Sequence, residues 1–177
     1  HGAGLVHRDV KPGNVLLAVD GPRMIDFGIA RMPEDTALTA SGMVVGSPGF
    51  LSPEQAQGRG REIGPPSDVF SLGCLLAYAV TGERPFGWGS AAETLVRTVH
   101  EEPGLDAVPE ALLPLLRGCL AKEPAARPAV TEVRRAPDGG GEGGGWLPEP
   151  GTRLVARRSG ARLALPAGAA TAVVGAA

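Results

Sequence analysis

Two short segments near the start of the chain constrain its fold and chemistry more than any other feature of the sequence. The first, residues 7–14, reads His-Arg-Asp-Val-Lys-Pro-Gly-Asn, and the second, residues 26–28, reads Asp-Phe-Gly. A lone His-Arg-Asp tripeptide arises by chance in surface loops. The two segments together fix many residue types at a set spacing, which a loop with scattered charges does not explain.

The side chains of these segments suit the transfer of a phosphoryl group. Such a transfer needs magnesium on the phosphates, an oriented nucleophile and neutralised charge. Asp9 is the candidate base that accepts the proton of a substrate hydroxyl, and Lys11 is a compact cation for the transferring phosphate. Asn14 and Asp26 offer oxygen ligands, which magnesium prefers. The expected metal is therefore Mg²⁺, bound together with substrate phosphates.

The residues between the two segments predict a β-hairpin. Residues 15–17 and 23–25 are short apolar runs, and they flank the Asp-Gly pair at residues 20–21. An Asp-Gly pair between such runs is a hairpin signal. Paired strands would hold Asn14 and Asp26 at neighbouring ends, which would bring both expected metal ligands together.

The chain after the hairpin is predicted to be mainly helical. Residues 29–53 have poor periodicity and read as a long loop, which inside a compact domain is usually functional. A buried helix is expected over 67–82, capped by Ser67 and ended by Gly82. This helix is shorter than the about 20 residues that a membrane span needs. Weaker helices are expected over three further ranges: 91–101, 109–121 and 128–135.

Several further segments make the chain resemble the eukaryotic-type serine/threonine protein kinases, and most closely their bacterial members. The family signature is H-R-D-L-x-x-x-N followed by D-F-G, and the chain departs from it only at Val10. Residues 52–54 stand where the family has A-P-E, and residues 46–50 resemble the segment just before it. Residues 68–73 resemble the start of the family's central helix, and residues 122–128 resemble its late arginine-bearing segment.

This resemblance assigns roles to individual residues. It implies that ATP and Mg²⁺ are the cofactors, that Asp9 and Lys11 are catalytic, and that Asn14 and Asp26 bind the metal. It also implies that Lys11, Asn14 and Asp26 contact the bound ATP. Lys11 at this place implies serine or threonine acceptors in protein substrates. It also implies a regulatory loop, in which Arg8 clamps a phosphate carried by Thr39 or Ser41.

Other residues have structural roles in the family. His7 is expected to stack under Phe27 of the Asp-Phe-Gly segment, which Gly28 completes. Ser47 is also expected to be structural, because it stands where the family has a threonine that contacts the catalytic aspartate. A buried ion pair is expected between Arg127 and Glu54, because planar bidentate pairing requires arginine. Asp68 is expected at the start of the central helix.

The resemblance extends over residues 1–137 and concerns only the C-terminal lobe of the kinase fold. The sequence contains no match to the G-x-G-x-x-G-x-V loop or to the V-A-I-K strand of the N-terminal lobe. The expected fold is thus mainly α with a small β-hairpin, a kinase-like C-lobe of the α+β family fold without its N-lobe. Residues 138–177 are expected to form a linker or disordered tail rich in Gly, Ala and Arg.

Composition restricts the partners and the compartment. The net charge of −2 argues against a nucleic-acid surface as the main partner. Cys74 and Cys119 lie in apolar helical patterns and are expected to be buried thiols of a reducing compartment. A cytoplasmic location is expected, or the cytoplasmic face of a membrane if a span follows downstream. A kinase dimer is a further possibility from the resemblance, and residues 163–177 are a poor candidate for a span.

Two other functions compete with a protein kinase. Small-molecule phosphotransferases of the aminoglycoside type share a His-x-Asp-x-x-x-x-Asn run. They lack the combination of Arg8 with Lys11, the Ser52-Pro53-Glu54 segment and the arginine partner for its glutamate. The non-enzymatic alternative is an inactive kinase remnant that binds partner proteins through its helical surface.

Overall fold

The computed structural model describes residues 5–18, 21–26 and 46–134. The described residues form two units, which are considered separately. One unit contains the outer part of a hairpin, residues 16–23, and the other contains residues 5–15, 24–26 and the helical residues 46–134.

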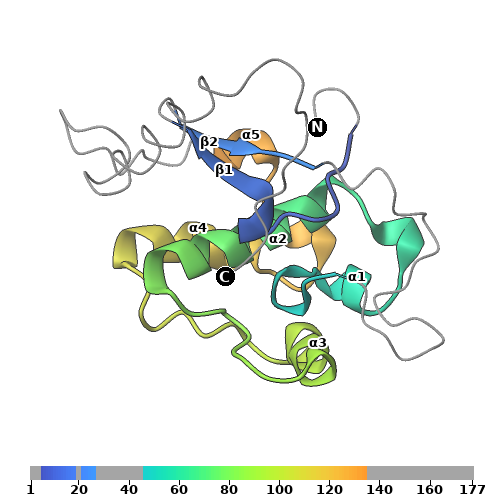
Figure 1. Ribbon diagram of the computed structural model, residues 1–177. Helices are drawn as coiled ribbons and strands as arrows, with labels where there is room; N and C mark the ends of the chain where they lie inside the picture. The colour runs from blue at the N-terminus through green and yellow to red at the C-terminus, as the bar shows by residue number, and fades with distance from the viewer. Residues whose placement is uncertain (1–4, 19–20, 27–45, 135–177) are drawn as a thin grey trace, which may run out of the picture. The chain divides into compact units, whose positions relative to one another are not determined.

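The predicted hairpin is confirmed. Strand β1 spans Val15–Ala18 and strand β2 spans Gly21–Met24, and the two pair in a two-stranded sheet (Figure 1). A short 3₁₀ turn, η1 (Pro12–Asn14), leads into β1. Gly21 has a φ of 131° at the start of β2, a backbone conformation that favours glycine.

The buried central helix is α2, and it spans Pro65–Thr81. It begins two residues before the predicted start, because two prolines fit its first turn, where their missing N–H groups are not needed. The predicted cap at Ser67 is therefore wrong, since Ser67 lies within the first turn. Gly82 ends the helix in the left-handed conformation, with a φ of 76°.

The remaining helices are short. The α-helices are α1 (Pro53–Ala56), α3 (Ala91–His100), α4 (Leu113–Cys119) and α5 (Val130–Val133). The 3₁₀ turns between them are η2 (Pro48–Phe50), η3 (Gly60–Glu62), η4 (Glu110–Leu112) and η5 (Pro124–Ala126). The helix predicted from residue 109 becomes α-helical only at Leu113, because Pro114 is tolerated only in a first turn. The helix predicted over 128–135 is reduced to the single turn of α5.

The core of the helical unit lies around α2. Its fully or almost fully buried side chains come from α2, α4 and the loops beside them, and they include Phe70, Cys74, Ala77, Phe86, Leu116 and Leu120. Helices α2 and α4 pack side by side (Figure 1). They approach closely at Gly73, where an added β-carbon would lie 2.8 Å from Cβ of Cys119. Helix α3 packs instead on α1 and η2.

The two cysteines lie in this core as free, buried thiols. Burial raises the pKa of Cys74 and raises the pKa of Cys119 to about 11, so both stay protonated. Among the helices of the described residues, none combines the length and the apolar character needed to cross a membrane.

Candidate active site

The candidate catalytic groups of the first segment lie in direct contact. The ammonium Nζ of Lys11 lies 2.8 Å from Oδ2 of Asp9. The side-chain amide of the buried Asn14 donates to the same carboxylate oxygen at 3.1 Å and to the backbone carbonyl of Asp9 at 2.8 Å. The turn η1 makes this possible, because it returns the backbone so that the Asn14 N–H donates to the Lys11 carbonyl at 3.0 Å. The Asp9 carboxylate is thus held by the Lys11 ammonium and the Asn14 amide.

The hairpin brings Asp26 next to this group. The N–H of Ile25 donates to the carbonyl of Asn14 at 2.9 Å, so the residue before Asp26 is paired with the expected second metal ligand. Asp26 has a φ of 57°, in the left-handed region that aspartate tolerates better than most residues. The structure therefore places Asn14 and Asp26 at the adjoining ends of the two strands.

His7 connects the two segments. Its ring Nδ1 accepts from the N–H of Asp9 at 3.3 Å, so Nε2 carries the proton and faces the carbonyl of Ile25 at 3.1 Å. The backbone N–H of His7 donates to Asp68 at 2.7 Å, and the N–H of Arg8 donates to the other carboxylate oxygen of Asp68 at 2.8 Å. His7 is buried, and its contacts are those of a residue that positions Asp9.

Asp68 anchors this loop to the start of α2. Burial raises the pKa of its carboxyl group, and the two backbone hydrogen bonds from His7 and Arg8 oppose that shift. Arg8 itself has a φ of 65°, which is uncommon for a residue with a β-carbon. Hydrogen bonds from other parts of the chain hold this conformation. The N–H of Arg8 donates to the Asp68 carboxylate, and the carbonyl of Arg8 accepts from a side-chain amide.

That amide belongs to Gln55, which was not among the residues predicted from the sequence. Its Nε2 donates to the carbonyl of Arg8 at 2.9 Å, while its Oε1 accepts from the N–H and the hydroxyl of Ser52. Gln55 thereby ties the one-turn helix α1 to the loop that carries Asp9. The Ser-x-x-Gln spacing of residues 52–55 is a helix-start signal and could have indicated α1, but not the long-range bond.

Arg127 and Glu54 form a bidentate pair with no solvent exposure of either side chain. Nη1 of Arg127 lies 2.7 Å from one carboxylate oxygen of Glu54, and Nη2 lies 2.9 Å from the other. The remaining donors of the guanidinium bind the carbonyls of Pro66, Ala121 and Lys122. Burial alone would raise the pKa of Glu54, but hydrogen bonds from Arg127 and Ser67 outweigh it, and the pKa is lowered.

Four predicted site residues lie outside the described residues. They are Phe27 and Gly28 of the second segment and the candidate phosphosites Thr39 and Ser41. The stacking of His7 on Phe27 and the clamping of a phosphate by Arg8 therefore stay predictions.

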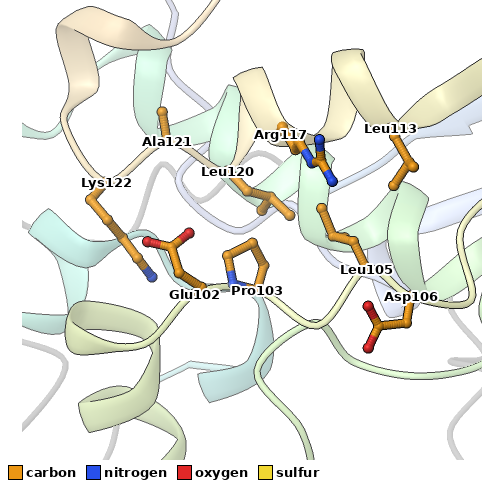
Figure 2. A pocket seen from close by; sticks show the side chains of 9 residues that line it. All are labelled: Glu102, Pro103, Leu105, Asp106, Leu113, Arg117, Leu120, Ala121 and Lys122. Atoms are coloured by element: carbon orange, nitrogen blue, oxygen red, sulfur yellow. The ribbon is translucent and has the colours of Figure 1, made fainter. Parts of the chain in front are cut away.

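A large cavity of the helical unit lies elsewhere. It has a volume of about 630 Å³ and is lined by residues between Glu102 and Lys122. Figure 2 shows leucines of the loop before η4 and of α4 along the cavity, with Lys122 and Glu102 pointing toward the same end. The Lys122 ammonium donates to the carbonyl of Thr98 at 2.6 Å, and burial lowers its pKa. None of the candidate catalytic side chains lines this cavity.

Comparison with protein families decides what kind of domain carries this site. Residues 1–137 match the family model described as the protein kinase domain. The chain belongs to the protein kinase family. In this kinase domain the matched residues include the Asp9 loop, Asp26, Glu54 and Arg127.

The relatives of this kinase domain include named bacterial enzymes. Serine/threonine-protein kinase AfsK of Streptomyces griseus is 45% identical over 172 residues, which cover 92% of this chain and 21% of AfsK. The probable serine/threonine-protein kinase PkwA of Thermomonospora curvata is 41% identical, over 97% of this chain and 22% of PkwA. Serine/threonine-protein kinase PknA of Mycobacterium tuberculosis is 42% identical, over 72% of this chain and 30% of PknA. The chain spans about a fifth of the length of AfsK and PkwA.

Proposed function

We propose that this chain carries the catalytic residues of a serine/threonine protein kinase, which transfers the γ-phosphate of ATP to serine or threonine hydroxyls of protein substrates. The observation that carries this proposal is the contact of Lys11 and Asn14 with one oxygen of Asp9. Family membership and the names of the relatives support the same reaction class.

In the proposed reaction Asp9 accepts the proton of the attacking hydroxyl. General bases of this kind need a fixed position within hydrogen-bond reach of the proton. His7 and Asn14 both contact Asp9, and Asp68 and Gln55 hold the backbone beside it. The Lys11 ammonium, next to the base, is placed to balance the charge of the transferring phosphate.

The oxygen atoms near Asp9 fit magnesium. Asn14 uses its Nδ2 for the two hydrogen bonds to Asp9, so its carbonyl oxygen Oδ1 is the atom left for a metal. Asp26 would supply a carboxylate oxygen from the adjoining strand end. Magnesium is usually held by one or two such protein ligands together with phosphate oxygens. Magnesium held by Asn14 and Asp26 would supply positive charge to balance the charge that develops on the phosphates.

The proposal places residues 1–137 in the C-terminal lobe of the kinase fold. It is supported by the catalytic loop, the hairpin and the Glu54–Arg127 pair, and by the lack of any sequence match to the Gly-rich loop or its lysine strand. The proposal also includes residues 138–177 as a linker or tail, which lies outside the described residues. A cytoplasmic site of action, a kinase dimer and a membrane anchor stay further proposals.

Replacement of Asp9 tests the proposed function. In the intact protein that contains this chain, Asp9→Asn should lower kcat for phosphate transfer to a Ser/Thr peptide by about 10²- to 10⁴-fold. Asp106→Asn is the matched control, because it removes an exposed carboxylate that contacts none of the candidate catalytic residues. Radiolabelled transfer at the wild-type rate in Asp9→Asn would refute the role of Asp9. Phosphotyrosine as the main product would refute the acceptor class.

A further inference from the structure

Arg84, in the loop between α2 and α3, carries a guanidinium held on aromatic rings. Its Cζ lies 4.1 Å from the ring centre of Trp88 and 5.6 Å from that of Phe50. Tyr78 meets both rings edge-on, with centre distances of 6.0 Å to Phe50 and 6.5 Å to Trp88. The ring faces attract the cation and restrict the arginine to one place.

The charge of Arg84 has no carboxylate beside it among the described residues. The adjacent Glu83 instead accepts from the indole N–H of Trp88 at 2.8 Å. Three other half-buried or buried arginines each donate to an oxygen of the described chain: Arg59, Arg97 and Arg127. For Arg84 no such acceptor is found in the described ranges. Its buried Nε lacks a partner there, as do the Nε atoms of Arg59 and Arg97, but those two arginines have an oxygen acceptor for another guanidinium nitrogen. A positioned cation without a counter-charge is suited to bind an anionic group from another molecule.

Arg84 lies against η2, the turn before α1, and α1 in turn contacts the loop that carries Asp9. Gly49 in η2 leaves room for its side chain, because an added β-carbon at Gly49 would lie 2.7 Å from Cδ of Arg84. Five residues after Phe50, Gln55 binds the carbonyl of Arg8, the residue before Asp9. Five residues span at most about 18 Å, and the turns of η2 and α1 shorten that span, so an extended peptide of about six residues is long enough to cover it.

We propose that Arg84 selects protein substrates that carry an acidic side chain within about six residues of the acceptor hydroxyl. This inference rests on the proposed kinase function and adds a recognition residue to it. The rings of Trp88 and Phe50 hold the guanidinium in place, and the missing side chain at Gly49 lets Arg84 pack against η2. The acidic side chain of the substrate would supply the counter-charge. The interaction is electrostatic, so it should weaken with ionic strength.

A peptide series measures this selection in the intact protein. Each peptide has one acceptor serine and a single glutamate moved through the six positions on either side, and a matched series carries glutamine instead. At one position, or at two neighbouring positions, the peptide with glutamate should have a kcat/KM about fivefold higher than the peptide with glutamine. An effect of this size is at the upper end of what an exposed ion pair contributes. The ratio should fall to about one in Arg84→Gln. Arg84→Glu should favour lysine at that position, whereas Arg84→Lys should keep the glutamate preference.

Three controls separate recognition from folding and from catalysis. Arg117→Gln makes the same charge change on α4 and should keep the wild-type ratio. For wild type itself, raising NaCl from about 0.05 to about 0.5 M should bring the ratio toward one, which tests the charge without any substitution. Fluorescence anisotropy with Asp9→Asn measures the binding of the same labelled peptides without transfer.

The outcomes distinguish this inference from the proposed function. An unchanged glutamate preference in folded Arg84→Gln, or no preferred position in wild type, would overturn the inference even if transfer depends on Asp9. If wild type transfers phosphate to no peptide but binds glutamate peptides through Arg84, the proposed function fails, and only the preference of Arg84 for acidic peptides stands. If neither transfer nor Arg84-dependent binding occurs, both fail.

Discussion

Arg8 shows how one residue is held in a conformation that its own sequence disfavours. Its φ of 65° costs energy for any residue with a β-carbon. The Asp68 carboxylate accepts from its N–H, and the Gln55 amide donates to its carbonyl. The backbone is therefore fixed from both sides immediately before Asp9, which gives the carboxylate of Asp9 a defined position.

Removal of the Asp68 carboxylate should release this loop. Asp68→Ala leaves the N–H groups of His7 and Arg8 without their acceptor and should lower the free energy of unfolding by about 2–4 kcal/mol. Urea denaturation measures this change, with the exposed Asp106→Ala as the control. A loss no larger than that of Asp106→Ala would show that the loop does not depend on this anchor.

At the scale of elements, the pair of Glu54 and Arg127 joins α1 to the chain between α4 and α5. Arg127→Met replaces the guanidinium that lies 4.9 Å from the ring centre of Phe70 with an apolar side chain, and it leaves the buried Glu54 charge without its partner. The free energy of unfolding should fall by about 3–5 kcal/mol. Urea denaturation checks this value, and Arg134→Met, at an exposed site just after α5, is the control for loss of charge. A change below about 1 kcal/mol, the size expected for a surface ion pair, would contradict the structural role.

The same pair predicts how acid affects stability. Its hydrogen bonds lower the pKa of Glu54 from its ordinary value of 4.5. A carboxyl group with a lowered folded-state pKa adds stability that is fully present above its unfolded pKa and is lost as pH falls through the folded value. Wild-type stability should therefore decrease below about pH 4.5, and Arg127→Met should lack this part of the decrease. Urea denaturation between pH 3 and 7 compares wild type with Arg127→Met. If the free energy of unfolding depends on pH in the same way in both proteins, Glu54 is not the source of the acid sensitivity.

The elements divide into those that the sequence could predict and those that it could not. The hairpin and α2 follow from apolar runs, an Asp-Gly turn and a glycine stop, which are local signals. The residue types around Asp9 and the pairing of Glu54 with Arg127 were predictable only from a family resemblance, because the partners are far apart in the sequence. Gln55 was missed, since its bond to Arg8 follows from the packing of α1 and has no signature in residues 52–55 beyond a helix start.

At the scale of the whole molecule, the chain carries the proposed catalytic residues but no sequence match to the phosphate-covering loop or its lysine. In this family the nucleotide lies between two lobes, and Asn14 and Asp26 alone would hold magnesium weakly because phosphates supply most of the other ligands. Residues 1–177 in isolation should therefore show no measurable kinase activity and should bind ATP poorly. Calorimetry measures ATP binding and radiolabelled phosphate transfer measures kinase activity, with the intact protein as the positive control. Transfer by the isolated chain that disappears in Asp9→Asn would contradict this.

The hydrogen bonds of Arg127 also bear on how this part of the protein can move. One guanidinium binds the carboxylate in α1, the carbonyl of Pro66 at the start of α2 and two carbonyls directly after α4. None of these segments can separate from the others without exposing a buried charge. Local opening at any one of them is therefore tied to opening at all three, and they fluctuate as one cooperative unit. The backbone around Asp9, bonded to this unit through Gln55 and Asp68, shares its rigidity.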